Sequence, residues 1–351
     1  MRAVRPYNSA ILKSDDRAPA GPPAAGPSSR GKADLVIRYR TFRNSDPPAL
    51  LQVWNEAFTQ RGSASLRITA WLEYFLFAKP YFDPQGMILA CADEKPIGFA
   101  LAGFGPDATG DAVDPDVGVL CAVGVIPAFR RQGIGSELLR RAEEYLRQRG
   151  AHTLTAGPVG GLNPFTFGLY GGSNSPGFLE SDAAAQPFLE RRGYQMRNTT
   201  LVFQRTLDRP LSLADGRFPA FRQRFEIHAG LRPASSWWQE GALGPVEMYE
   251  YQLFDKSAGR GAARAYLWEM DTFRPRWNNH GIGIVDLEVE PAQRGQGIAK
   301  FLLAQILLHL QEQFFSLAEI QVREENAAAV KLLSGLGFTQ VDRGHGYGRV
   351  E

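Results

Sequence analysis

The chain has 351 residues, and its 39 Lys and Arg against 37 Asp and Glu give a formal net charge of +2. Charged residues make up 22% and hydrophobic residues 44%, a composition that excludes a disordered or fibrous protein. The near-neutral balance gives no bias toward polyanions, and at roughly 150 residues per domain the length predicts about two domains.

The two cysteines, Cys91 and Cys121, each lie inside an apolar run, which favours buried free thiols over a secreted disulfide framework. No stretch approaches the roughly 20 uninterrupted apolar residues that cross a bilayer, and the N-terminus lacks an apolar signal-peptide core. We therefore expect a cytoplasmic protein without a membrane partner. Residues 1–33 are expected to be a disordered tail, because Ala, Pro, Gly, Ser and charged residues dominate them.

Hydrophobic periodicity predicts the elements of the first half. In chain order they are strand Leu35–Phe42, helices Ala49–Phe58 and Thr69–Phe82, a hairpin of Met87–Ala92 with Ile97–Phe104, strand Val117–Val125, helix Ile134–Arg149, strand His152–Ala156, helix Ala184–Arg191 and strand Met196–Arg205.

The second half repeats the later elements of the first. The hydrophobic periodicity of its first strand and first helices is weak, and we place them between Phe225 and Trp238. The others are strands Met248–Phe254, Ala262–Met270 and Ile282–Val289, helix Ile298–Phe314, strand Glu319–Val322, helix Ala327–Leu336 and strand Tyr347–Val350.

Two motifs occur twice, in the same order. In the first, a strand ends in Val-x-Pro and leads into Arg-x-x-Gly-x-(Gly/Ala), over Val125–Gly135 and again over Val289–Ala299. The second motif pairs Asp182–Tyr194 with Asn326–Phe338. Because two ordered pairs are hard to obtain by chance, we expect two copies of one fold. The expected domains are 34–208 and 225–351, with a linker over 209–224.

The first motif has the residue types of a phosphate-binding turn. Amides in the first turn of a helix lack intrahelical partners and carry the positive end of the dipole, so they attract a pyrophosphate. Glycine lets the anion approach the backbone, and Arg130 or Arg294 is expected to add a fixed charge beside it. Neither copy fits the dinucleotide Gly-x-Gly-x-x-Gly or the Gly-Lys-Ser/Thr loop. Such a turn can be purely structural, but two copies in matching context favour binding.

These residues resemble the GNAT superfamily of N-acetyltransferases, whose motifs are (Gln/Arg)-x-x-Gly-x-(Gly/Ala) and Asn-x-x-Ala-x-x-Leu-Tyr-x-x-x-Gly-Phe. The resemblance covers about Val36–Leu207 and Phe225–Glu351. It implies an α/β (α+β) chain of two tandem GNAT folds, each a mixed, mostly antiparallel sheet flanked by helices and splayed between its fourth and fifth strands. Acetyl-CoA would enter that split as acyl donor. The tandem arrangement also looks like that of the mycothiol synthases.

By this resemblance the turns hold the pyrophosphate, and the strand ends pair with the pantetheine arm like an added strand. The implied cofactor-binding residues are Val125, Arg130, Arg131, Gln132, Gly133, Ile134, Gly135 and Ser136 in the first copy, and Val289, Arg294, Gly295, Gln296, Gly297, Ile298, Ala299, Lys300 and Asn326 in the second.

The acid and base positions depart from the family pattern. The position of the acid Tyr is Leu189 in one copy and Leu333 in the other, and the position of a base Glu is Gln321. The carboxylates that remain near the second turn are Asp286 and Glu288, of which Glu288 is the catalytic candidate. The alternative interpretation is that both side chains simply face solvent, because they alternate with the apolar residues of a strand.

The first copy carries an insertion, Gly157–Asp182, that the second lacks. Long loops are uncommon unless they are functional, so a substrate lid is one hypothesis. Phe165, Phe167 and Tyr170 would then form a pocket, with Tyr170 as a replacement acid. The alternative is a loop that packs against the other copy.

Other conspicuous residues favour structural roles. Trp237, Trp238, Trp268 and Trp277 are expected in the core or at the seam between copies. His280 and His345 have no partner at metal-ligand spacing, so no metal site is expected. Nothing resembles a nucleic-acid module.

The sequence therefore predicts an acetyl-CoA-dependent N-acetyltransferase that transfers acetyl directly to a primary amine. The acceptor, a small molecule or a peptide, is not identified, and a monomer or a homodimer is expected. We favour the first copy as catalytic because its insertion can enclose an acceptor and because the second copy lacks the Glu and Tyr of the family pattern. The opposite assignment, with the second copy as the enzyme and the first as a scaffold, is the alternative. The alternative is a non-catalytic tandem acyl-CoA-binding or regulatory protein, which the missing Tyr supports.

Overall fold

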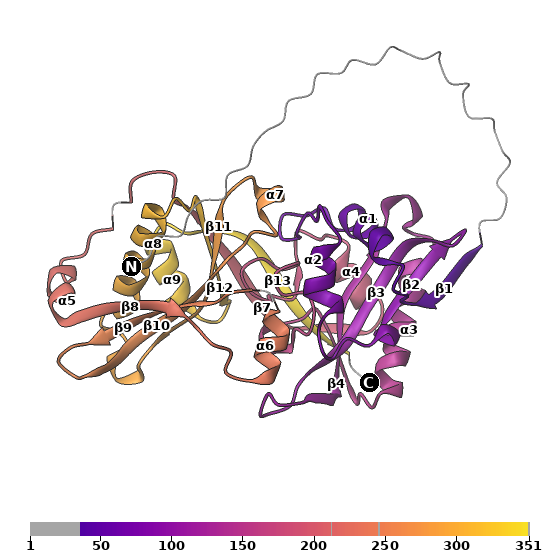
Figure 1. The fold of residues 1–351 in the computed structure, drawn as a ribbon, viewed down its shortest axis with the longest axis horizontal. Coiled ribbons are helices and arrows are strands. Elements are labelled where there is room, and N and C mark those ends of the chain that lie inside the picture. The colour runs from indigo at the N-terminus through magenta and orange to yellow at the C-terminus, as the bar shows by residue number, and fades with distance from the viewer. Residues whose placement is uncertain (1–35, 212, 245, 350–351) are drawn as a thin grey trace, which may run out of the picture. The chain divides into compact units, whose positions relative to one another are not determined.

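The computed structural model describes residues 36–211, 213–244 and 246–349, so the tail expected over 1–33 lies outside the described residues. Figure 1 shows the arrangement of the elements. The N-terminal copy has strands β1 (Ile37–Thr41), β2 (Met87–Ala92), β3 (Lys95–Pro106), β4 (Val113–Val125), β5 (Thr153–Ala156), β6 (Phe178–Leu179) and β7 (Tyr194–Thr206). Its helices are α1 (Pro47–Ala57), α2 (Ala70–Leu72), α3 (Ile134–Gln148) and α4 (Ala185–Glu190), with shorter turns η1 (Glu73–Phe77), η2 (Pro84–Gly86), η3 (Pro127–Phe129) and η4 (Gly160–Leu162).

The C-terminal copy follows the same plan. Its strands are β8 (Phe225–Leu231), β9 (Tyr249–Asp255), β10 (Arg260–Glu269), β11 (Gly281–Val289), β12 (Leu317–Arg323) and β13 (Thr339–Arg349). Its helices are α5 (Phe218–Arg224), α6 (Trp237–Leu243), α7 (Arg274–Trp277), α8 (Ile298–Glu312) and α9 (Ala327–Gly335), with the turn η5 (Pro291–Gln293). Among the described helices, none is long and apolar enough to span a bilayer.

All the named strands belong to one sheet, in the order β1-β2-β3-β4-β5-β13-β7-β12-β11-β10-β9-β8, with β6 paired to β13 off this path. Strand β4 runs parallel to β5, and β11 runs parallel to β12. Every other neighbouring pair is antiparallel. The expected mixed, mostly antiparallel architecture with flanking helices is confirmed.

The two copies exchange their last strands (Figure 1). Strand β13 lies between β5 and β7, with Tyr347 opposite Ala156. Strand β7 in turn pairs with β12, so that Phe203 lies opposite Ile320. Each copy therefore completes the sheet of the other, and the backbone hydrogen bonds run without interruption across the seam.

The apolar side chains form two cores, and each draws on both copies. The larger core, in the N-terminal copy, includes Trp268 and Tyr347 from the C-terminal copy. The smaller core includes Leu201 and Phe203 of β7. Trp238, Trp268 and Trp277 are buried, as expected of core or seam residues, whereas Trp237 keeps 38% of its surface exposed.

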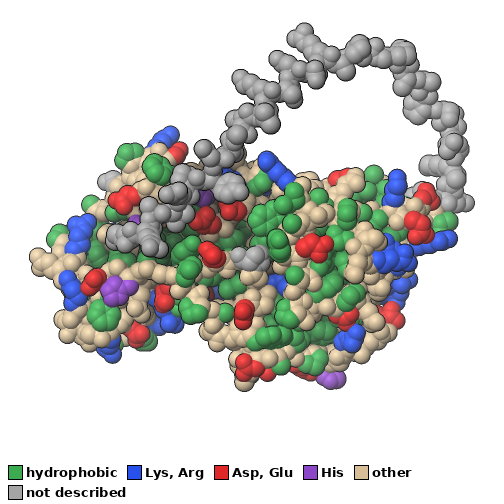
Figure 2. Space-filling view, in the orientation of Figure 1, with side chains coloured by type: hydrophobic (Ala, Val, Ile, Leu, Met, Phe, Trp, Pro, Cys, Tyr) green, Lys and Arg blue, Asp and Glu red, His purple; other side chains and the backbone are tan. Residues whose placement is uncertain are grey.

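The helices that follow the two turns are buried to different extents. Helix α3 buries one face, which includes Leu138, Leu139 and Leu146, against β3 and β4 and exposes arginines on the other. Helix α8 is apolar on most sides, and Phe301, Leu302, Leu303, Ile306, Leu307 and Leu310 are all buried. On the face drawn in Figure 2, acidic and basic side chains are interspersed, in keeping with the near-neutral charge.

Several expected elements differ from the structure, among them the helices expected between Phe225 and Trp238, which are α5 and α6 on either side of β8. The helix expected over Thr69–Phe82 is only α2 and the π-helical turn η1, because Pro80 disfavours helical backbone at Lys79. The range expected as a linker, 209–224, ends in helix α5, and its Phe218 is buried. Strand β13 is much longer than the expected Tyr347–Val350. Its glycines Gly344, Gly346 and Gly348 have low strand propensity, which hid it in the sequence.

Candidate functional site

The N-terminal turn joins β4 to α3. Gly133 caps the helix with φ 82°, and Arg131 also has a positive φ, of 64°. Among the described residues, no side chain caps this 15-residue helix, and none lies within 4 Å of the place that a Cβ at Gly133 would take. The N-terminal end of the helix is therefore open beside Gly133, an arrangement that suits an anion at a helix N-terminus.

A pocket of about 580 Å³ lies beside this turn. We call it the N-terminal pocket. It is lined by Ala57, Phe58, Leu120, Val123, Gly124, Val125, Arg130, Arg131, Gly133, Gly135, Ser136, Phe178, Asp182, Ala183, Ala184, Ala185, Pro187, Phe188, Leu189, Arg191 and Arg192. Of the residues expected to hold a cofactor here, only two are absent from the lining. Gln132 donates to the carbonyl of Ala128, and Ile134 is buried in the core.

The pocket lies where the sheet opens. Strand β4 pairs with β5 only as far as Leu120 opposite Ala156, and the chain then leaves the sheet at Gly157. A bulge at the same level makes Cys121 an extra residue, because Leu120 and Ala122 pair with consecutive residues of β3. Bulges bend strands and end pairing, so the local geometry holds the split open.

Four arginines line the N-terminal pocket, and one of them, Arg130, is bound to backbone carbonyls of the chain. Its guanidinium is held in place by hydrogen bonds to the carbonyls of Val125 and Ala57, both at 2.9 Å. Arg294 makes the equivalent bond to Val289.

The remaining charges come from Arg131 and from a pair that our sequence reasoning missed. Arg191 and Arg192 line the pocket from the end of α4, and Arg192 donates to Ser136 Oγ at the turn. The doubled arginine at the end of the predicted helix Ala184–Arg191 was the available signal. Three arginines thus stand beside the open end of a helix, which suits a polyphosphate.

Asp182 is the one carboxylate among the described residues that line the N-terminal pocket. Burial raises the pKa of this carboxyl group, and the amide of Ala184 and the charge of Arg130 act in the opposite direction. The sequence indicates Asp182 only as the counterpart of Asn326 and as the last residue of the insertion. In the structure Asn326 caps α9, where its side chain accepts from the amide of Ala329.

The C-terminal turn has the same backbone but different surroundings. Gly297 caps α8 with φ 92°, yet the guanidinium of Arg217 fills the place that a Cβ there would take. Arg217 donates to the carbonyl of Gln296 at 2.9 Å and pairs with Asp215. Lys300 is 3.0 Å from the same carboxylate. Hydrogen bonds from Arg217 and Lys300 hold the pKa of Asp215 well below its usual range.

The insertion of the N-terminal copy packs against the sheet of the C-terminal copy and reaches the point where β11 and β12 separate. Gln321, the position of the family's base, donates to the carbonyl of Gly171 at 2.7 Å. The amide of Ser173 donates to the buried carboxylate of Glu319 at 2.6 Å, and Trp268 donates to the carbonyl of Ser173. Of the two interpretations of the insertion, these contacts fit packing against the other copy.

The aromatic residues of the insertion are buried. Phe165 packs near Tyr81 and Phe82, and Phe167 packs on Trp268. Only the end of the insertion, at Phe178 and Asp182, lines the N-terminal pocket.

Neither predicted catalytic side chain lines the N-terminal pocket. Tyr170 is buried, and its hydroxyl accepts a hydrogen bond from the amide of Leu179. Glu288 is exposed and pairs with Arg264 at 2.7 Å. Asp286 is also exposed, with φ 51° at a bulge of β11.

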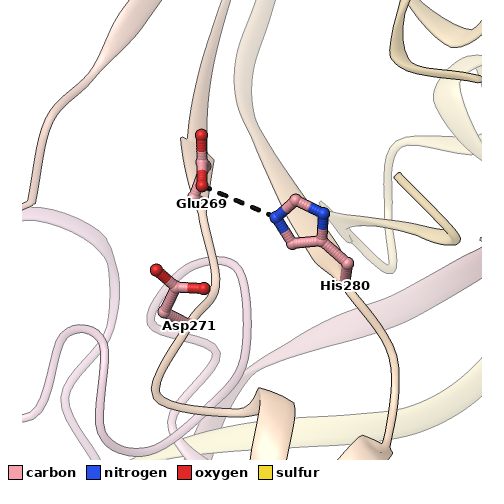
Figure 3. Close-up of side chains that lie close together, drawn as sticks. All are labelled: Glu269, Asp271 and His280. Carbon is pink, nitrogen blue, oxygen red and sulfur yellow. Dashed lines mark ion pairs between the residues drawn. The ribbon is translucent and has the colours of Figure 1, made fainter. Parts of the chain in front are cut away.

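The fold gives His280 the acidic neighbours that its sequence surroundings lacked. Glu269, Asp271 and His280 offer ligand atoms within 4.8 Å of one another (Figure 3). Glu269 Oε2 is 3.6 Å from His280 Nε2. The expectation that His280 has no partner at this spacing is corrected, but exposed acidic groups commonly adopt such spacing without an ion. His345 is buried beside Thr199.

Two glycine turns, each leading from an opened parallel strand pair into a helix, define the class of protein: a tandem acyltransferase fold. The chain belongs to the acetyltransferase (GNAT) family, whose profile matches residues 48–170 and 231–338. Mycothiol acetyltransferase of Rhodococcus erythropolis is 33% identical over 125 residues. That match covers 34% of this chain and 40% of the relative, less than half the relative's length.

Solved structures share the fold at low identity. A tandem GNAT protein from the clavulanic acid biosynthesis pathway has a TM-score of 0.60 at 16% identity, over 89% of this chain and 98% of that one. A GCN5-related N-acetyltransferase from Sphaerobacter thermophilus has a TM-score of 0.59 at 16% identity, over 89% and 95%. The glucosamine N-acetyltransferase region of a fungal multi-domain β-N-acetylglucosaminidase has a TM-score of 0.63 at 16% identity, over 90% of this chain and 38% of that one.

Proposed function

We propose that this protein is an acetyl-CoA-dependent N-acetyltransferase whose N-terminal copy binds the donor and carries the reaction. The observation that carries the proposal is the contrast between the two turns. The N-terminal turn opens onto a pocket with Arg131, Arg191 and Arg192, whereas Arg217 and Asp215 cover the C-terminal turn. Family membership supports acetyl transfer as the reaction.

The N-terminal pocket fits the donor's chemistry. The pyrophosphate would lie on the first-turn amides of α3, with the three arginines as counter-charges. The pantetheine arm would lie against the apolar side chains of Val123, Phe178 and Leu189, which also line the pocket. Backbone groups of Val125 remain the proposed partners of the arm, although the Val125 carbonyl already accepts from Arg130.

Asp182 is the proposed general base. An acceptor amine reaches the pocket as an ammonium ion and must lose a proton before its nitrogen can attack the thioester carbon. The Asp182 carboxylate would accept that proton. The nitrogen–carbon bond then forms, the carbon–sulfur bond breaks, and the thiolate of CoA takes up the proton that the nitrogen releases. Desolvation brings the pKa of the base closer to neutral pH and so suits this role.

The acceptor is proposed as a primary amine on a small molecule or a peptide. Compartment and oligomeric state also stay proposals. The two free, buried cysteines support a reducing compartment such as the cytoplasm. The exchanged strands give each copy a partner within one chain, which supports a monomer.

The test measures release of CoA from acetyl-CoA by the full chain with a panel of amines: a peptide N-terminus, lysine, a polyamine, an aminoglycoside and an amino sugar. Release that depends on one amine, with that amine acetylated, is the expected result. Acetyl-CoA binding by calorimetry without release for any amine would instead support the non-catalytic acyl-CoA-binding protein. Absence of binding would overturn both.

A further inference from the structure

The end of helix α1 is held by arginines from both copies. The last carbonyls of a helix have no intrahelical partner and are satisfied well by cationic donors. The carbonyl of Ala57 accepts from Arg130 of the N-terminal copy. The carbonyls of Phe58 and Thr59 accept from Arg276 of the C-terminal copy, at 3.0 and 2.8 Å.

The guanidinium of Arg276 extends this contact into the next loop. Its Nε donates to the carbonyl of Ser63 at 2.6 Å, and Ser63 Oγ donates to the Phe58 carbonyl at 3.0 Å. The neighbouring Trp277 donates to the carbonyl of Arg61 and stacks on Phe273. Arg276 is therefore fixed on a packed element and binds several carbonyls of one loop.

The loop matters because Phe58 is a wall of the N-terminal pocket. Its side chain is 3% exposed and contacts Trp54, Phe99 and Tyr170. A Cβ at Gly124 of β4 would lie 3.0 Å from the Phe58 ring. Because ring and strand are this close, a shift of the Phe58 backbone changes the width of the pocket beside β4.

We infer that Arg276 is a positioning residue: through the carbonyls of Phe58, Thr59 and Ser63, the C-terminal copy sets the shape of the acyl-CoA pocket of the N-terminal copy. Because the donor in that pocket is acetyl-CoA only under the function proposed above, the inference rests on that function. The C-terminal copy would then contribute to donor binding even though its own glycine turn is covered by Arg217.

Calorimetry of acetyl-CoA on the full chain tests the inference. Arg276→Ala is expected to weaken affinity about tenfold, the effect of losing charged hydrogen bonds, and Arg276→Lys to recover part of it. Arg274→Ala, an exposed arginine of the same helix, is the matched control and is expected to bind like the wild type. Melting temperatures are recorded for all variants.

A double-mutant cycle with Phe58→Ala separates positioning from general stability. If Arg276 acts through Phe58, the double variant binds no more weakly than Phe58→Ala alone. Two results would overturn the inference. One is a double variant whose loss of acetyl-CoA affinity equals the product of the losses in the two single variants. The other is an Arg276→Ala protein that has a lower melting temperature but binds acetyl-CoA like the wild type. If Arg276→Ala does not fold, Arg276→Lys takes its place in the cycle. A wild type that does not bind acetyl-CoA would overturn the proposed function itself, and the inference with it.

Discussion

The guanidinium of Arg217 lies over Gly297, with its Nη1 only 2.5 Å from the place where a Cβ would be. At the equivalent Gly133, no atom of residues 36–211, 213–244 or 246–349 lies within 4 Å of that point. One backbone motif is thus open in the first copy and covered by the chain's own ion pair in the second.

This contrast predicts one acetyl-CoA per chain. Gly133→Glu puts a carboxylate and a strained residue into the open turn, so calorimetry is expected to show binding abolished. Gly297→Glu is expected to leave the single binding event unchanged. Gly133→Ala carries the backbone strain, about 1 kcal/mol, without the charge and serves as the control. Two binding events in the wild type would contradict the prediction.

Removing the cover tests whether the second turn still functions. In the Asp215→Ala, Arg217→Ala variant the ion pair over Gly297 is gone and Lys300 is released to bind an anion. A second, weaker binding event is expected in the same titration. It should disappear again when Gly297→Glu is added, while the first event persists. A single event in the double variant would mean that the turn is inactive for another reason, such as the insertion that contacts Gln321.

Asp182→Asn is expected to lower the rate of acetyl transfer by about 100-fold, the usual contribution of a general base, with acetyl-CoA affinity retained. The base acts when deprotonated, so the wild-type rate should rise with pH through the raised pKa of Asp182 and reach a plateau. The variant should lack that rise. Glu180→Gln, an exposed neighbour, is the control. An unchanged pH profile in Asp182→Asn would count against the assignment.

Glu319 predicts a pH dependence of stability. Burial raises the pKa of its carboxyl group above the ordinary value of 4.5. The folded state therefore binds the proton more tightly than the unfolded state, and this contribution is complete below pH 4.5 and lost as the pH rises through the folded pKa. The unfolding free energy of the wild type relative to Glu319→Gln should decline over that window. Denaturant titrations from pH 4 upward measure it, and a constant difference would refute it.

The sequence predicted what is local. Both turns follow from glycine spacing between a strand and an amphipathic helix, and most strands follow from alternation. The strand exchange could not be predicted, because the pairing of β13 with β5 joins residues far apart in the chain and leaves no local pattern. The aromatic residues of the insertion were ambiguous for the same reason. Phe167 is apolar whether it faces a substrate or Trp268, and only the fold decides.

The residues of the N-terminal pocket are likewise of two kinds, those of the local turn and those that the fold brings to it. Val125, Gly133 and Ser136 are fixed by the turn and were predictable. Arg191, Arg192 and Asp182 reach the pocket from the region of α4, which the fold brings to the turn. Arg130 also lines the pocket, but its hydrogen bonds to two carbonyls of the chain could not be predicted from residue type.

The exchange of β7 and β13 also constrains how the protein is made. When the N-terminal copy has left the ribosome, the edge of β5 still lacks its neighbour, since β13 follows the other strands of the second copy in the chain. An open strand edge is prone to pair with other chains. The sheet of the first copy can therefore be completed only after β13 of the second copy has been synthesised. A nascent chain stalled before Thr339 would expose the edge of β5.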